Sequence, residues 1–306
     1  MSLPEERSRK KMLLGADGNA LVNLVIVIAV AFVLLKFILV IYQLGGLNVE
    51  AYEPNVFNWF ALPASLEKLL SRPWTLITSM FIHKEVMHMV ANLLWVWMFG
   101  YILQDLTGNR KLVPVFLYGG LAGGLAFIAM NYLLPRLQPF IDESWYFGSN
   151  AGVMAVAIAT TTVAPDYRIF PMVNGGIPLW IISAIFVIVD FAGIGASPAV
   201  YLAHLAGALT GFVFIYQMRR GKDWSMPVNR FFDWILNLAN PDKPSVKNKR
   251  DEFFYKVSGR SPFKKTPHIT QQRIDQILDK INSEGYHLLT DEEKDILRRA
   301  ANEDDL

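Results

Sequence analysis

Six long apolar runs constrain the fold of this chain more than any other feature. The first, Leu21–Tyr42, is about as long as a helix that crosses a bilayer core and is interrupted only by Asn23 and Lys36. The others are Val86–Leu103, Leu112–Leu134, Asn150–Ala164, Ile177–Phe191 and Tyr201–Met218. Only 18% of the residues are charged, against about 25% in soluble domains. The sequence therefore predicts an all-α polytopic membrane protein with a six-helix bundle.

The charges of the short loops predict the orientation of this bundle. The first run is too long for a signal peptide and no small-residue cleavage site follows it, so we expect a retained helix. With the N-terminus inside, seven Lys and Arg residues lie inside and three outside. The inner residues are Arg7, Arg9, Lys10, Lys11, Arg110, Lys111 and Arg168, and the outer ones are Lys68, Arg72 and Arg136. Since basic residues favour the cytoplasmic side, we expect both termini in the cytoplasm.

The chain divides into four predicted parts. A polar lead covers residues 1–19, the membrane domain residues 20–220, a linker residues 221–265, and a small cytosolic helical hairpin residues 266–306. In the tail, Ile274, Ile277, Leu278 and Ile281 have the spacing of an amphipathic helix, and Thr290 with Glu293 predicts a capping box. A weakly ordered tail is the alternative. The net charge of +2 is too small to indicate nucleic-acid binding, and without cysteine there is no thiol nucleophile.

Polar motifs open three of the apolar runs. The segment Gly148-Ser149-Asn150-Ala151-Gly152 has the outline of a serine-hydrolase turn, G-x-S-x-G, with Asn150 at the nucleophile position. His88 and Asn92 lie near the start of the second run, and His204 opens the sixth. In the expected topology these three starts lie at one outer depth, and polar groups inside a membrane are costly. We therefore expect them to form one site, with helices packed through Gly148, Gly152, Gly207 and Gly211.

These motifs resemble the rhomboid family of intramembrane serine proteases over about Asn19 to Arg220. In that family a G-x-S-G turn supplies the nucleophile. Its A-H-x-x-G-x-x-x-G pattern, here Ala203, His204, Gly207 and Gly211, supplies the base, and its H-x-x-x-N pattern, here His88 and Asn92, supports the oxyanion. The resemblance implies a rhomboid-like bundle in a bacterial inner membrane that acts on transmembrane proteins without cofactor or metal. The tail around 271–298 is similar to an extension of Bacteroidetes-type rhomboids.

Two positions depart from the family. Its Trp-Arg pair reads Trp74-Thr75 here, and Asn150 stands where the catalytic serine is expected. Asparagine has no nucleophilic hydroxyl, although it can form hydrogen bonds and hold a closed site by pairing with His204. Ser149 is a candidate substitute nucleophile if the turn is shifted, and a helix cap otherwise.

Three functions remain open at this stage. The chain is a protease that uses Ser149, a pseudoprotease that binds transmembrane clients without cutting them, or a carrier. The carrier would need repeated or broken helices, which the sequence does not contain. Two further interpretations are that His83 and His88 bind a metal, which their spacing of five disfavours, and that Asp190 faces water or a loop. Chemistry favours the pseudoprotease, whereas family membership alone favours the protease.

Overall fold

The computed structural model describes residues 18–170, 172, 175–192, 197–238 and 271–303, without the side chains of 271–273 and 298–303. Residues 1–17 of the predicted lead and 239–265 of the predicted linker lie outside this set, as do residues 266–270 of the predicted hairpin. The chain forms two compact units, residues 1–239 and 240–306, which are described separately.

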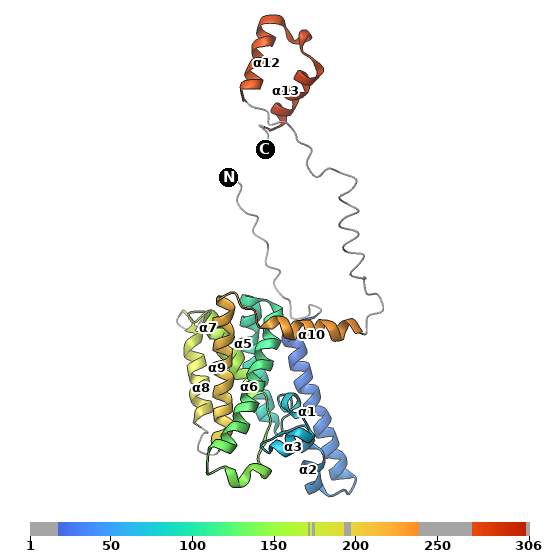
Figure 1. Cartoon of the computed structure of the whole chain (residues 1–306), viewed down its shortest axis with the longest axis vertical. Helices are drawn as coiled ribbons and strands as arrows, with labels where there is room; N and C mark the ends of the chain where they lie inside the picture. The colour runs from blue at the N-terminus through green and yellow to red at the C-terminus, as the bar shows by residue number, and fades with distance from the viewer. Residues whose placement is uncertain (1–17, 171, 173–174, 193–196, 239–270, 304–306) are drawn as a thin grey trace. The chain divides into compact units, whose positions relative to one another are not determined.

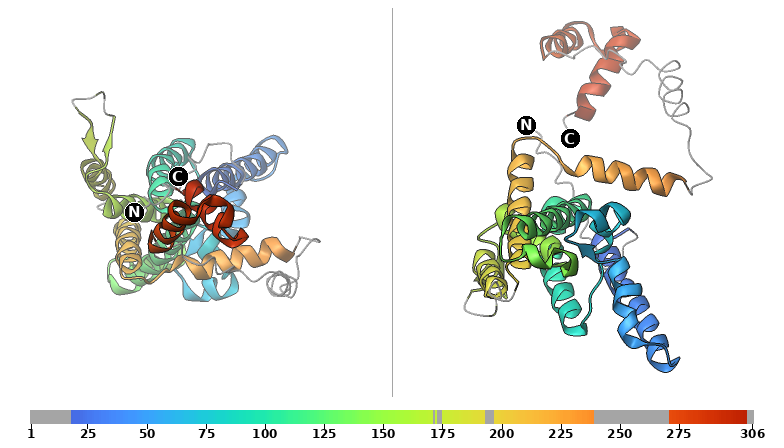
Figure 2. Two further views of the ribbon diagram at one scale, coloured as in Figure 1. Left: turned by 90° about the horizontal axis from the view of Figure 1, so that it is seen from above. Right: turned by 60° about the horizontal axis from the view of Figure 1, so that its bottom comes forward.

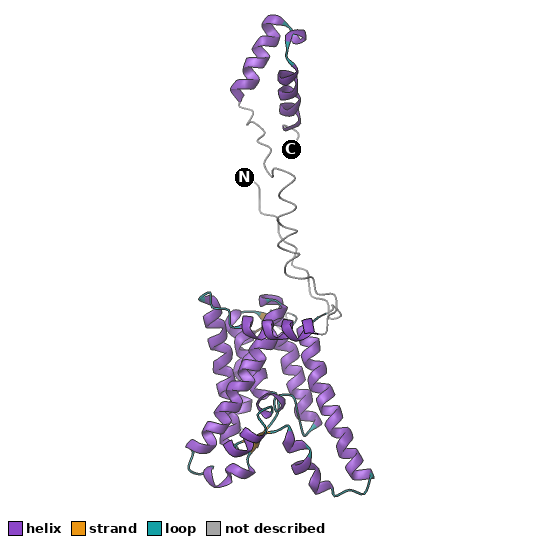
Figure 3. Ribbon diagram, turned by 45° about the vertical axis from the view of Figure 1, so that its right-hand side comes forward, coloured by secondary structure: helices purple, strands orange, loops and turns teal. Residues whose placement is uncertain are grey.

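The first unit is a bundle of apolar helices (Figures 1 and 3). Among the described residues, four helices are long and apolar enough to cross a membrane: α1 (Ala20–Leu44), α5 (Val86–Thr107), α6 (Leu112–Leu133) with the preceding turn η3 (Asn109–Lys111), and α9 (Pro198–Arg219). Two shorter apolar helices, α7 (Asn150–Val163) and α8 (Leu179–Phe191), complete the set. The predicted fold class is therefore confirmed, with six apolar helices close to the predicted bounds.

Short elements fill the connections. Between α1 and α5 lie η1 (Val49–Ala51), α2 (Tyr52–Asn55), η2 (Phe57–Trp59), β1 (Leu62–Pro63), α3 (Leu66–Ser71) and α4 (Thr75–Thr78). The remaining ones are η4 (Gln138–Glu143), β2 (Trp145–Tyr146), β3 (Arg168–Ile169) and β4 (Ile177–Pro178). β1 pairs with β2 in antiparallel register, Leu62 opposite Tyr146, and β3 pairs with β4. The β1–β2 pair ties the long first connection to the residues just before α7.

Helix α7 packs against α5, α6 and α9 and is buried along most of its length. A Cβ atom at Gly207 of α9 would collide with the backbone of Ala151, and one at Gly211 with the backbone of Ala155. Because both contacts join residues 56 positions apart (207 − 151 and 211 − 155), α7 and α9 run parallel and in register. α7 and α9 therefore begin at the same end of the bundle, which we call the site end. Close approach of backbones through small residues is how membrane helices associate tightly.

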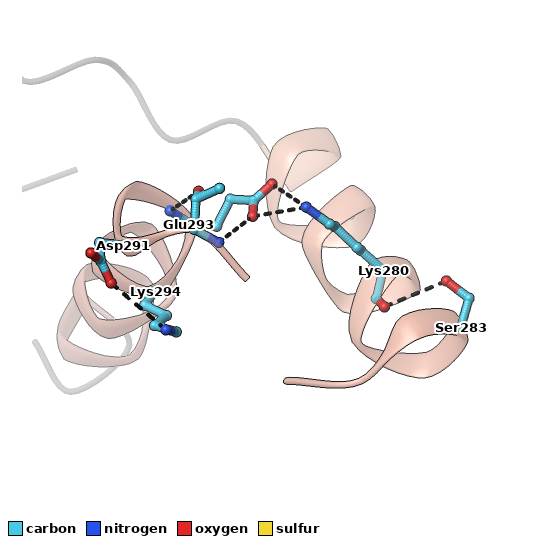
Figure 4. Close-up of polar contacts among 6 residues, drawn as sticks. Lys280, Ser283, Asp291, Glu293 and Lys294 are labelled. Carbon is cyan, nitrogen blue, oxygen red and sulfur yellow. Dashed lines mark hydrogen bonds and ion pairs between the residues drawn. The ribbon is translucent and has the colours of Figure 1, made fainter. Parts of the chain in front are cut away.

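Helix α10 (Ser225–Leu238) follows α9 and lies within the segment predicted to be a linker. The second unit contains α12 (Gln271–Glu284), η5 (Tyr286–Leu288) and α13 (Asp291–Glu303). The Thr290–Glu293 capping box is present as predicted: the Thr290 N–H donates to Glu293 Oε2 at 2.9 Å and the Glu293 N–H to Thr290 Oγ1 at 3.3 Å. Glu293 also binds Lys280 Nζ at 3.1 Å, which joins α12 to α13 (Figure 4).

Candidate functional site

The turn before α7 has a conformation that requires glycine. Gly148 has φ of +102°, a region that L side chains rarely adopt. A Cβ atom there would also lie 3.2 Å from Cε1 of His88. The Gly148 N–H donates to the Ser79 carbonyl at 2.9 Å, which fixes the turn against the residues before α5. Gly148 therefore shapes the turn and precedes the helix, whereas Gly152 packs within α7 against Phe116.

The side chain of Asn150, the first residue of α7, is held by α5. Its Oδ1 atom lies 2.7 Å from His88 Nε2 and 2.6 Å from Asn92 Nδ2. Because a carbonyl oxygen only accepts hydrogen bonds, both nitrogens donate to it, and His88 carries a proton on Nε2. Two N–H donors that converge on one carbonyl oxygen have the geometry of an oxyanion hole. The expected pairing of Asn150 with His204 is not among the hydrogen bonds of the described residues.

Ser149 contacts a different histidine, His83, which precedes α5. The Ser149 side chain is buried, with Oγ 3.2 Å from His83 Nε2, and its backbone N–H donates to the same nitrogen at 3.4 Å. Since Nε2 accepts a backbone N–H, the proton of neutral His83 lies on Nδ1. Ser149 occupies the N-cap position of α7, but its side chain makes no capping hydrogen bond. Asn92 Nδ2 lies 3.3 Å from His83 Nε2, so the amide of Asn92 lies beside both His83 and the Asn150 carbonyl oxygen.

His83 gives the site a measurable pH dependence. Burial, with a smaller contribution from His88, lowers the pKa of His83 from 6.5 to about 4. The unfolded chain therefore takes up a proton at higher pH than the folded protein. We expect the contribution of His83 to the free energy of unfolding to be constant above about pH 6.5 and to fall by about 3 kcal/mol as the pH decreases to about 4.

Thermal unfolding in detergent at a series of pH values measures this effect. The variant His83→Gln keeps hydrogen-bonding groups but has no titrating ring, so this part of the pH dependence should disappear. An unchanged pH profile in the variant would show that other groups cause the loss of stability.

His204 pairs with Asp190, which corrects the expectation that Asp190 faces water or a loop. Nδ1 of His204 lies 2.9 and 3.0 Å from the two carboxylate oxygens, and both side chains are buried. An aspartate that accepts the Nδ1 proton fixes the histidine tautomer and leaves Nε2 as the basic nitrogen. The sequence signal for this pair is an acidic residue in the otherwise apolar run that ends at Phe191.

The register of α7 and α9 places His204 near the turn. Gly207 contacts Ala151, so His204, one turn earlier in α9, lies at the level of the Gly148–Ser149 turn. The ring centroids of Tyr146 and Tyr201 lie 6.2 and 5.6 Å from that of His204. Burial raises the pKa of Tyr146, and the nearby Asp190 charge raises it further.

An adjacent cavity of about 260 Å³ provides access to this region. It is lined by Lys84, Glu85, His88, Trp145, Tyr146, Phe147 and Val200. His88 and Asn150 are half-buried, whereas Ser149 is buried. Across the described residues, no group of three or more His, Cys, Asp or Glu side chains is arranged to hold a metal ion.

The fold and site define a polytopic helical membrane protein with histidine and amide side chains gathered at one end of its bundle. Residues 70–221 match the family model of the Rhomboid domain. The chain therefore carries a segment that is similar to a rhomboid domain. Residues 263–303 match a family of unknown function, DUF6576.

Curated relatives are distant. The chain is 25% identical over 180 residues to the rhomboid protease GlpG of Pectobacterium atrosepticum, a match that covers 56% of each chain. It is 28% identical over 173 residues to the mitochondrial presenilin-associated rhomboid-like protein A of Danio rerio, covering 55% of this chain and 43% of the relative. It is 27% identical over 190 residues to the mitochondrial RHOMBOID-like protein 6 of Arabidopsis thaliana, covering 57% of each. The chain thus spans about half the length of these relatives.

Proposed function

We propose that this protein is a rhomboid pseudoprotease, which binds transmembrane client proteins in the bilayer and does not cut them. The observation that carries the proposal is the position of the Asn150 carboxamide, whose oxygen accepts hydrogen bonds from His88 Nε2 and Asn92 Nδ2. The side chain at the nucleophile position supplies no hydroxyl, and its own carbonyl oxygen occupies the donors that would otherwise hold a substrate carbonyl.

On this proposal the other polar side chains of the site have the roles that they would have in a serine protease, but the nucleophile is missing. His204, oriented by Asp190, is the base, and His88 and Asn92 are the oxyanion donors. A client helix enters from the lipid and unfolds near its end, and its backbone competes with Asn150 for the two donors. Without an attacking hydroxyl no acyl-enzyme forms, and the client leaves intact.

The second candidate function is that of an intramembrane serine protease. We test it because one relative is named as a rhomboid protease. One observation favours it, namely the 3.2 Å separation of Ser149 Oγ and His83 Nε2, which is within reach of a nucleophile–base pair. Two observations oppose it: Ser149 is buried, and a base with a pKa of about 4 drives proton removal weakly at neutral pH. Under this candidate His83 takes the hydroxyl proton as Ser149 Oγ attacks the peptide carbonyl. The C–N bond then breaks, the amine leaves with that proton, and water hydrolyses the acyl-enzyme to regenerate Ser149.

Labelling separates the two candidates. The purified full chain, reconstituted in vesicles, is treated with a fluorophosphonate and, in parallel, mixed with a generic transmembrane substrate that carries a photo-crosslinker. The pseudoprotease crosslinks to the substrate but takes up no label and releases no fragments. Labelling that disappears in Ser149→Ala would establish the protease and reject our proposal.

The proposed orientation follows from the loop charges, and the proposed membrane follows from the family resemblance. We infer a bacterial inner membrane, with the site end toward the outside and both chain ends in the cytoplasm. A reporter enzyme fused to the C-terminus tests this, because a reporter that is active only in the periplasm should stay inactive.

The Asp190–His204 pair predicts a positioning effect that can be measured once a hydroxyl is present. In the Asn150→Ser background, Asp190→Asn should lower kcat by roughly two orders of magnitude or more, because the amide favours the wrong histidine tautomer. KM should change little, and the acidic limb of the pH–rate profile should shift. Equal loss of activity at all pH values, with a lower unfolding temperature, would indicate that Asp190 is only structural.

A further inference from the structure

Helix α10 has an exposed apolar face that neither family match covers, since the matches end at residue 221 and resume at residue 263. Phe231, Trp234, Ile235 and Leu238 follow the i, i+3, i+4, i+7 pattern of one helix face. Their exposed fractions are 55, 58, 40 and 61%. A polar face turned away from it is formed by Asn229, Arg230, Asp233 and Asn237, and the exposed Phe232 and Leu236 lie on the flank between the two faces.

Polar contacts fix α10 to the end of the bundle opposite the site. Lys111 forms an ion pair with Asp223 and donates to Ser225 Oγ at 2.9 Å, just where α10 begins. Asn229 Nδ2 donates to the Arg110 carbonyl at 3.0 Å. Arg110 also reaches Asp233 at 3.4 Å. The polar side of the helix therefore contacts η3, and the apolar face makes none of these bonds.

The direction of α10 differs from that of the spans. It runs across the end of the bundle, whereas α9 and α1 run along it (Figures 1 and 2). Only residues 220–224 separate it from α9, whose exposed Leu209 and Phe212 belong to a candidate membrane span. Along the chain, the apolar face of α10 thus follows closely after the exposed apolar surface of a candidate membrane span.

We propose that α10 lies in the interfacial layer of the bilayer around the bundle, with its apolar face toward the acyl chains. An in-plane helix of this kind has a large apolar face and a polar face, and tryptophan is favoured at headgroup depth. Basic residues cluster at the same end and complement anionic headgroups: Arg219, Arg220, Lys222 and Arg230. α10 then fixes the depth of the end of α9 in the membrane.

The absence of cysteine from the chain makes this proposal directly testable. Single cysteines at Phe231, Trp234 and Ile235 test the apolar face, and Arg230→Cys and Asn237→Cys test the polar face. Leu209→Cys is the lipid-facing control in α9. Each full-length variant is spin-labelled in vesicles of phosphatidylcholine and phosphatidylglycerol, and its collision rates with oxygen and with a water-soluble nickel chelate are measured.

We expect the ratio of oxygen to nickel collisions to be several-fold higher at the three apolar positions than at the two polar ones, and close to that of Leu209→Cys. Equal ratios on both faces would overturn the proposal, because the helix would then lie in water. Low collision rates with both reagents at the apolar positions would also overturn it, because a protein partner or a second copy would then cover the face.

Discussion

Replacing Asn150 with serine is expected to convert the protein into an active protease. The new hydroxyl would take the place of the carboxamide at the start of α7, and His88 and Asn92 would become free to hold a substrate carbonyl. His204 would be available as the base, with its tautomer set by Asp190. Loss of the nucleophile costs about six orders of magnitude in kcat in one measured protease, so even partial recovery would be easily detected.

The measurement compares the parent chain, Asn150→Ser and Asn150→Ala on one transmembrane substrate in vesicles. Asn150→Ala is the matched control because it also frees the two donors but provides no hydroxyl. We expect fragments and fluorophosphonate labelling from Asn150→Ser only, with a rate roughly a thousandfold or more above both others. If Asn150→Ser folds and binds substrate but does not cut, the frame around position 150 lacks a working base.

The second large effect is expected from valine at Gly207. Its Cβ would occupy the position of the Ala151 backbone, so α7 and α9 would have to separate at the level of the site. Inserting side-chain atoms into a packed core typically costs about 1–3 kcal/mol, and a clash with backbone cannot be relieved by a change of rotamer. We expect the free energy of unfolding to fall by about 3 kcal/mol or more.

Thermal unfolding in detergent micelles, followed by circular dichroism, measures this loss. Leu209→Val is the matched control, since it introduces the same side chain at an exposed position of the same helix. It should change the unfolding temperature little. Similar unfolding temperatures for both variants would show that the α7–α9 contact is not as close as the structure indicates.

The sequence predicts the bundle well because run length and hydropathy are local properties. The starts of α5, α6 and α7 lie where the runs begin, and the Thr290–Glu293 cap is set by spacing alone. By contrast, the partners of individual side chains depend on how each helix is rotated about its axis. α7 is apolar around most of its circumference, so its sequence does not indicate that Asn150 faces α5.

One further feature depends on a contact between helix ends that the apolar pattern does not encode. The pairing of Asp190 with His204 requires the end of α8 to meet the start of α9. The sequence does not predict how the connection between these two helices is shaped. Helix α10 is different from this pair, because its i, i+3, i+4, i+7 pattern is present in the sequence. The pattern predicts an amphipathic helix when residues 225–238 are considered separately from the polar stretch that follows.

The hydrogen bonds of Asn150 also bear on the genetics of this protein. Each asparagine codon differs from a serine codon by a single base, and the two groups that hold the Asn150 carboxamide, His88 and Asn92, come from another helix, α5. On the proposed function, one transition in the gene would restore proteolysis. If cutting is harmful to the cell, selection removes such revertants, and deep sequencing of mutagenised cells would show serine codons depleted at position 150.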